Sequence, residues 1–316
     1  GMNVLPRGIG YAALGLTPAA LLAGAFGIPD AVQSGLVGIG LILVGAVAVG
    51  SEYDRALGPT DGISVERSDA VDAGAVVAGA IVTYLLHVHA APGPVLASAL
   101  VGLGVGVTAD EIGVPAYCGS FAGMASPALF PSVGYVAAAG TVAGLAYVAA
   151  GRAFDGFGGK LGTIAFFGCV STASLTGATY AAASPLAWHD ARLVVPVAAA
   201  GAVATAILSR RLGLGAVIGS ALVGVVAAVA LPAAVPAAGD TLAAVAFCAS
   251  FVGMSASGRL DGEVPVALAG ALCGVVFVLV AGAFPGAGGK LGTTAFVACL
   301  CYSGTERLLD ESLSPV

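Results

Sequence analysis

The chain has 316 residues, of which 59% are hydrophobic and only 9% are charged, and its mean hydropathy is +1.03. Soluble domains usually carry roughly 25% charged residues, so this composition argues against an ordinary soluble protein. The formal net charge is −6 and no basic stripe is present, which argues against a nucleic-acid partner. We therefore predict an all-α polytopic membrane protein in a lipid bilayer. An Ala-rich soluble protein is the alternative.

In chain order, the first feature is a pair of apolar runs, 8–27 and 34–50. They predict a transmembrane hairpin within residues 1–50. A secretory signal is the other interpretation of the first run, although no convincing Ala-x-Ala cleavage site precedes the second. Residues 51–71 form the longest polar stretch and predict a solvated cytoplasmic connection.

Two sets of five apolar segments follow. The first set, within residues 72–180, comprises 72–86, 94–108, 113–130, 133–151 and 160–175. A linker over 181–193 leads to the second set, within residues 194–305, which comprises 194–209, 215–231, 242–256, 264–282 and 290–304. Residues 306–316 form a polar tail. With the hairpin, these segments predict about twelve transmembrane helices.

The two sets are copies of each other. The sequence Gly-Gly-Lys-Leu-Gly-Thr occurs at 158–163 and again at 288–293, and the windows 154–169 and 284–299 agree at eleven of sixteen positions. We call the two six-residue stretches, 158–163 and 288–293, the first and second GGKLGT motifs. The segments 116–124 and 246–254 also correspond at the same offset of 130 residues. The chain therefore contains an internal duplication, which sets the fold before any single helix does.

Five crossings per copy is an odd number, so the copies are predicted to be inverted relative to each other. Twelve crossings place eight of the nine arginines on the side of the N-terminus. If 116–124 and 246–254 re-entered instead of crossing, the split would be six against three. The positive-inside rule favours the inverted arrangement, with both termini cytoplasmic and the protein in the cell membrane. The expected pathway lies on the pseudo-two-fold axis, where short or broken helices meet.

The GGKLGT motifs predict an anion site. Two glycines before a helix expose backbone N–H groups and the positive end of the helix dipole, and Lys160 or Lys290 adds a full charge. Interfacial lysines that extend to water are the alternative. In the inverted arrangement Lys290 lies on the side that the arginines avoid, which favours a functional role. The motif lacks the spacing of a nucleotide-binding P-loop.

Small and polar residues in the third segment of each copy predict either close helix packing or discontinuous helices that line a pathway. Asp110, Glu111 and Asp240 lie at predicted loop edges, where solvated loop charges are expected. The six cysteines have no metal-ligand spacing, so we expect small buried side chains and no metal or cofactor. No catalytic constellation is present, so an enzyme is not predicted.

Together these patterns predict a transporter or channel for a small solute, with an anion favoured. A channel for a neutral solute or a cation, or a non-transporting scaffold or receptor, remains an alternative, and the plan is compatible with a homo-oligomer. The expected substrate-binding residues supply attraction, hydrogen bonds, free backbone and apolar walls: Lys160, Lys290, Thr163, Thr293, Ser120, Ser250, Gly159, Gly289, Phe121, Phe251, Met124 and Met254.

Overall fold

The computed structural model describes residues 4–27, 31–58 and 66–313, and these contain helices and turns but no strand. The all-α prediction is therefore confirmed for the described part of the chain. Helices satisfy their backbone hydrogen bonds internally, which suits segments with so few polar side chains. The middle of the polar connection and both chain ends, which the predictions above also covered, lie outside the described residues.

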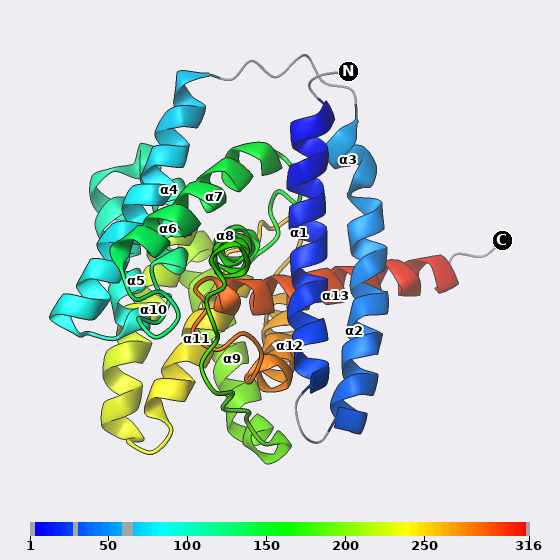
Figure 1. Ribbon diagram of the computed structural model, residues 1–316. Helices are drawn as coiled ribbons and strands as arrows, with labels where there is room; N and C mark the ends of the chain where they lie inside the picture. Colours follow the sequence, from blue (N-terminus) through cyan, green and yellow to red (C-terminus); the bar gives the residue numbers. More distant parts are fainter. Residues whose placement is uncertain (1–3, 28–30, 59–65, 314–316) are drawn as a thin grey trace.

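The N-terminal hairpin consists of α1 (Val4–Gly24) and α2 (Ala31–Ser51), each 21 residues long, with a short 3₁₀ turn η1 (Ala25–Gly27) after α1. A further short helix, α3 (Tyr53–Leu57), follows α2. Helix α1 packs on α7, α8 and α13, while α2 packs on α13. The hairpin therefore lies along one side of the molecule, as Figure 1 shows.

The two predicted sets of segments form two sets of helices. The first set is α4 (Arg67–Leu85), the π-helical turn η2 (Leu86–Ala90), α5 (Pro94–Thr108), α6 (Asp110–Ala122), α7 (Val133–Ala150) and α8 (Lys160–Thr176). The second set is η3 (Trp188–Asp190), α9 (Ala191–Ala206), the π-helical turn η4 (Ile207–Arg211), α10 (Ala216–Ala234), α11 (Gly239–Gly253), α12 (Glu263–Val280) and α13 (Lys290–Leu313).

Two boundaries differ most from the predicted segments. Helix α6 ends at Ala122, whereas the predicted segment ran to residue 130, because the chain turns after Gly123 and the backbone N–H of Ser126 donates to Gly286 O at 2.8 Å. Helix α13 continues to Leu313 and so includes most of the predicted tail. Glu, Arg and Leu are good helix formers, so nothing in that stretch ends the helix.

Both sets pack in the same pattern. Helix α4 contacts α6 and α7, α9 contacts α11 and α12, and α5 lies against α10. The turn after each third helix bonds to the loop before the other set's last helix, through Ser126 N–H to Gly286 O and Ala256 N–H to Gly156 O. Helix α4 begins at the upper edge of Figure 1 and α9 at the lower edge, so the two sets enter the fold from opposite ends.

Five helical stretches of the described chain are long and apolar enough to cross a membrane: Arg67–Ala90, Val133–Ala150, Trp188–Arg211, Ala216–Ala234 and Glu263–Val280. Helices α5, α6 and α11 have only 15, 13 and 15 residues. At 1.5 Å per residue each is well short of a hydrocarbon core of about 30 Å. The fold is therefore compatible with a membrane protein that contains short internal helices.

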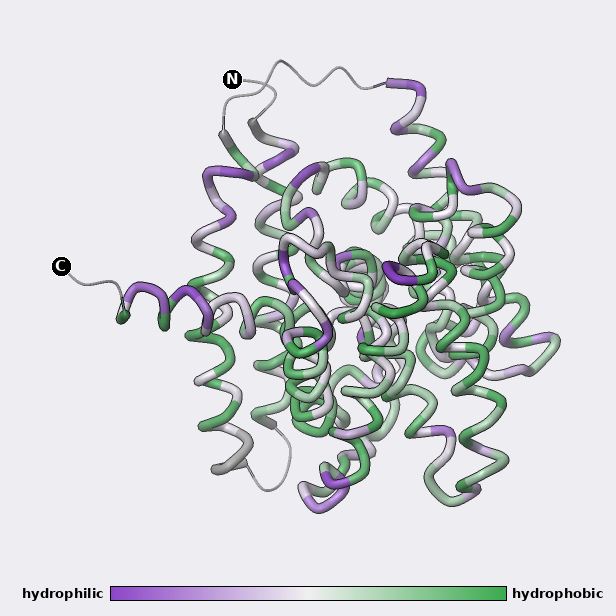
Figure 2. Tube along the Cα trace, turned by 180° about the vertical axis from the view of Figure 1, so that it is seen from behind, coloured by the Kyte–Doolittle hydropathy of each residue, from purple (hydrophilic) through white to green (hydrophobic). Residues whose placement is uncertain are grey.

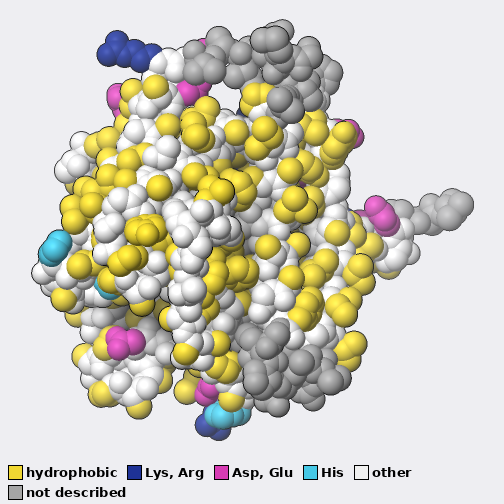
Figure 3. Space-filling view, viewed as in Figure 1, with side chains coloured by type: hydrophobic (Ala, Val, Ile, Leu, Met, Phe, Trp, Pro, Cys, Tyr) yellow, Lys and Arg dark blue, Asp and Glu magenta, His cyan; other side chains and the backbone are white. Residues whose placement is uncertain are grey.

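The surface agrees with that assignment. The chain trace in Figure 2 is mainly hydrophobic along the helices, and its hydrophilic parts include the start of α4 and the far end of α13. In Figure 3 hydrophobic side chains cover much of the face in view, while charged side chains are few. Exposed apolar residues of this kind would contact lipid in a membrane.

Candidate functional site

Each GGKLGT motif begins a helix from a glycine in the left-handed region. Gly159 has φ of 83° and Gly289 has φ of 80°, and the next residue is the first of α8 or α13. Phe154 and Phe284, five residues earlier, also have positive φ of 56° and 47°. The two loops therefore share one unusual backbone path, which favours glycine at the same positions in both windows.

The two motifs meet at the centre of the molecule, where α8 crosses α13 (Figure 1). A Cβ atom on Gly162 would overlap the backbone of Gly292, and one on Gly159 would overlap both Gly292 and Phe296. Only glycine permits this close approach. The motif glycines thus have a packing role, since they let the two helix starts interlock.

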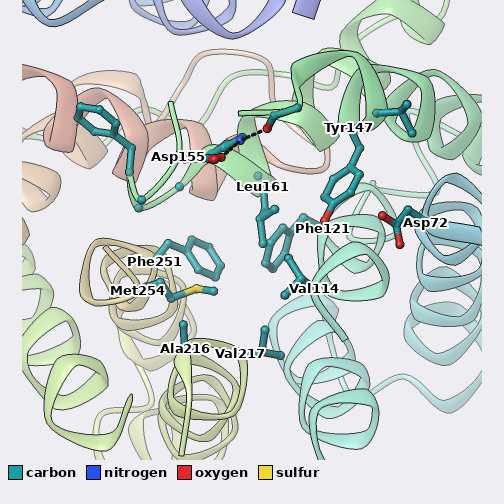
Figure 4. A pocket seen from close by; sticks show the side chains of 18 of the residues that line it. Asp72, Val114, Phe121, Tyr147, Asp155, Leu161, Ala216, Val217, Phe251 and Met254 are labelled. Atoms are coloured by element: carbon teal, nitrogen blue, oxygen red, sulfur yellow. Dashed lines mark hydrogen bonds and ion pairs between the residues drawn. The ribbon is translucent and has the colours of Figure 1, made fainter. Parts of the chain in front are cut away.

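A cavity of about 390 Å³, here called the Lys160 cavity, opens beside the first motif. Its walls come from the start of α4, the end of α7, the 151–159 loop, the start of α10 and the end of α11. Figure 4 shows Asp72 and Tyr147 on one wall, with Phe251 and Met254 on another. Of the described residues, three carboxylates line it, Asp69, Asp72 and Asp155, against one ammonium, so this cavity is acidic.

A second cavity of about 420 Å³, here called the Lys290 cavity, opens beside the second motif. Its lining residues are largely the counterparts of the first set at offsets of 130 or 122: Val95 for Val217, Met124 for Met254, Phe277 for Tyr147 and Gly289 for Gly159. Asp240, in the first turn of α11, lines this cavity, whereas the first turn of α4 lines the other. These two helix starts lie at opposite ends of Figure 1.

The two lysines have different partners. Lys160 Nζ lies 2.7 Å from the carboxylate of Asp155 and donates to Gly151 O at 2.8 Å. Lys290 Nζ donates to Ala281 O, the counterpart of Gly151 O, at 2.7 Å. Pro285 stands where the first copy has Asp155, and within the described chain no carboxylate forms an ion pair with Lys290.

A cluster of buried aromatic rings adjoins the Lys160 cavity, which Phe121 and Phe251 line. Phe121 and Phe251 have ring centroids 4.8 Å apart, and Tyr117 and Phe247 pack on them at 4.5 and 4.8 Å. All four side chains are almost fully buried. Both predicted phenylalanines therefore belong to the Lys160 cavity.

The predicted hydroxyl residues lie elsewhere. Ser120 is hydrogen-bonded to Ser98 at 2.8 Å, and Ser250 to Ser220 at 2.7 Å, so these hydroxyls join α6 to α5 and α11 to α10. Thr163 and Thr293 donate to the carbonyls of Gly159 and Gly289 within their own helices. These two serines and two threonines are fully buried and line neither cavity. The structure thus brings the predicted lysines, motif glycines, phenylalanines and methionines to the cavities, but not these hydroxyls.

Sequence reasoning missed Asp72, Tyr147 and Asp155, all of which line the Lys160 cavity. The sequence does contain a signal for Asp155, because position 155 is one of the five at which the two windows differ. Asp72 and Tyr147 had none, since their place in the cavity depends on how α4 and α7 pack.

A buried ion pair ties the hairpin to the first motif. Glu52, which is 1% exposed, accepts two hydrogen bonds from Arg259, at 2.7 and 2.9 Å. The guanidinium of Arg55 lies 3.0 Å from the same carboxylate. Arg259 also donates to Asp155 O and lies over the ring of Phe157 at 4.1 Å. The prediction of a solvated connection over residues 51–71 therefore does not hold at Glu52, which is buried.

The described residues contain no cluster of three or more His, Cys, Asp or Glu side chains that could hold a metal ion. The six cysteines are free and buried, as expected of small apolar side chains. Comparison with protein-family models, with characterised proteins and with solved structures finds no match. A function must therefore be inferred from the geometry of the two cavities.

Proposed function

We propose that this chain is an integral membrane transporter or channel that moves a small solute between two inverted five-helix repeats. The observation that carries the proposal is the pair of cavities, of about 390 and 420 Å³, lined by corresponding residues of the two copies. Transporters built from inverted repeats place their substrate where the repeats meet, and there discontinuous helices present their N-termini. Helices α8 and α13 begin at such a meeting point.

The opposite starts of α4 and α9 support the inverted arrangement (Figure 1). In the inverted arrangement, the Lys160 cavity faces the side of the N-terminus and the Lys290 cavity faces the other side. The short helices α5, α6 and α11 would then lie within the bilayer as parts of broken or incomplete spans, protected from lipid by the longer helices around them.

The closed centre favours a carrier or a gated channel over an open pore. The Phe121 and Phe251 rings are buried at the wall of the Lys160 cavity, and α8 and α13 are in close backbone contact where the motifs cross. Solute passage would require these aromatic side chains or the two helix starts to move, so that access alternates between the cavities.

A small anion is the proposed solute, because each cavity contains a lysine beside a helix N-terminus. The acidic lining of the Lys160 cavity favours a second candidate, passage of a cation or a neutral polar solute. If the protein is a non-transporting scaffold or receptor, the duplicated motifs serve only to pack the helices together.

The test is flux into proteoliposomes for a panel of small anions, cations and neutral solutes. We expect wild-type protein to move at least one anion and the Lys160→Ala/Lys290→Ala variant to lose most of that flux. Arg192→Ala is the matched control, because it removes an exposed basic side chain that lines neither cavity.

Flux of cations or neutral solutes that survives the double substitution would favour the second candidate. Absence of flux for every solute, with correctly folded protein, would contradict transport and favour a scaffold or receptor.

A further inference from the structure

The loops before α8 and α13 share their backbone but differ in one charged residue. Both pass through a phenylalanine with positive φ, a glycine with φ of 79° or 84° and a second glycine with φ of 83° or 80°. The residue between the phenylalanine and the first of these glycines is Asp155 in one loop and Pro285 in the other. A carboxylate partner for the lysine is thus built into the first copy and replaced by an uncharged ring in the second.

This difference leaves the ammonium of Lys290 with a carbonyl partner but no counter-ion among the described residues. Its side chain lies in a cavity whose walls are mainly apolar, with Val95, Met124, Phe277 and Leu291 among them. A cation in apolar surroundings is costly unless an anion compensates it. One donor bond to a carbonyl also leaves two N–H groups of the ammonium available to a ligand.

We propose that the Lys290 cavity binds a small aliphatic monocarboxylate, with its carboxylate on the Lys290 ammonium and its alkyl chain against the apolar wall. This inference rests on the proposed function and narrows its solute to one chemical class and one of the two cavities.

The charges around the cavity select a single negative charge. Among the described residues Lys290 is the only cation that lines it, and Asp240 also lines it, so a second carboxylate on the ligand would have no partner and would be repelled. The Lys160 cavity does not suit the same ligand, since Lys160 is already paired with Asp155 and since Asp69 and Asp72 add further negative charge.

The experiment measures butyrate binding to the detergent-solubilised full chain, through the rise in melting temperature that a ligand of the folded state produces. Butyramide, which has nearly the same shape without the charge, is the ligand control. We expect wild type to be stabilised by butyrate and not by butyramide. Lys290→Gln should weaken butyrate binding at least tenfold, and Lys290→Arg should retain it.

The sharper variant is Pro285→Asp, which installs in the second loop the residue that the first loop carries on the same backbone. It should supply an internal counter-ion to Lys290 and weaken butyrate binding at least tenfold while the unliganded protein stays folded. Arg192→Gln, which removes an exposed basic side chain that lines neither cavity, is the matched control and should bind butyrate as wild type does.

Equal binding by wild type, Lys290→Gln and Pro285→Asp would overturn the assignment, as would stabilisation by butyramide or no stabilisation of wild type. Butyrate binding without flux in proteoliposomes would contradict transport but leave this site standing. Flux of another solute without butyrate binding would contradict this site but leave the proposed transport standing.

Discussion

Glu52 and Arg259 form the most buried ion pair among the described residues, with 1% and 13% of their side chains exposed. Because removing one partner leaves the other charge buried without compensation, Glu52→Gln should lower the free energy of unfolding by about 3 kcal/mol. Arg259→Leu added to it should recover part of that loss, since it removes the stranded charge and places the residue that the first copy has at position 129. Melting temperatures in detergent test both; a neutral single variant would contradict the role of the pair.

The same pair predicts a pH dependence. Burial alone would raise the pKa of the Glu52 carboxyl, but the hydrogen bonds and charges of Arg259 and Arg55 outweigh it and hold the pKa below its usual 4.5. A carboxyl with a lowered pKa in the folded state stabilises that state above its unfolded pKa and loses the effect as pH falls through the folded value. Wild type should therefore lose more stability than Glu52→Gln between pH 7 and pH values below about 4.5.

At the scale of elements, the crossing of α8 and α13 depends on glycine. Gly162→Ala should separate the two helix starts, because the new Cβ would overlap Gly292, and backbone on both sides leaves nowhere to move. Overpacking of this kind typically costs about 1–3 kcal/mol, so we expect a clear fall in melting temperature.

Gly104→Ala in α5 is the matched control for that substitution. A Cβ there meets no atom within 4 Å, and alanine favours a helix interior over glycine. Its melting temperature should be unchanged or slightly higher. Equal effects of the two substitutions would show that the motif glycines are not required for close approach.

At the scale of the whole molecule, the two cavities should open to opposite sides of the membrane. Val217 lines the Lys160 cavity and Val95, its counterpart, lines the Lys290 cavity. We expect Val217→Cys and Val95→Cys to react with a membrane-impermeant maleimide from opposite faces of oriented vesicles. The six native cysteines are buried, so wild type should react little and serves as the control. Labelling of both variants from one face would contradict the inverted arrangement.

The sequence by itself determined the helical class, the positions of most helices and the correspondence between two copies. These follow from local properties: apolar runs satisfy their backbone groups as helices, and the repeated windows with Lys160 and Lys290 show the duplication directly. The end of α6 was missed, because the turn after Gly123 is held by Gly286, a residue distant in the chain.

Only the tertiary structure decided which predicted site residues share a cavity. Serines 120 and 250 are small polar residues in the right segments, yet they join neighbouring helices, because the side a helix turns to a cavity depends on its packing. The lysines look equivalent in sequence, but Asp155 neutralises one, while the other, with Pro285 at the matching position, has no counter-ion in the part of the chain that the structure describes. Charge balance depends on distances of a few ångströms between separate segments, and such distances exist only in the folded chain.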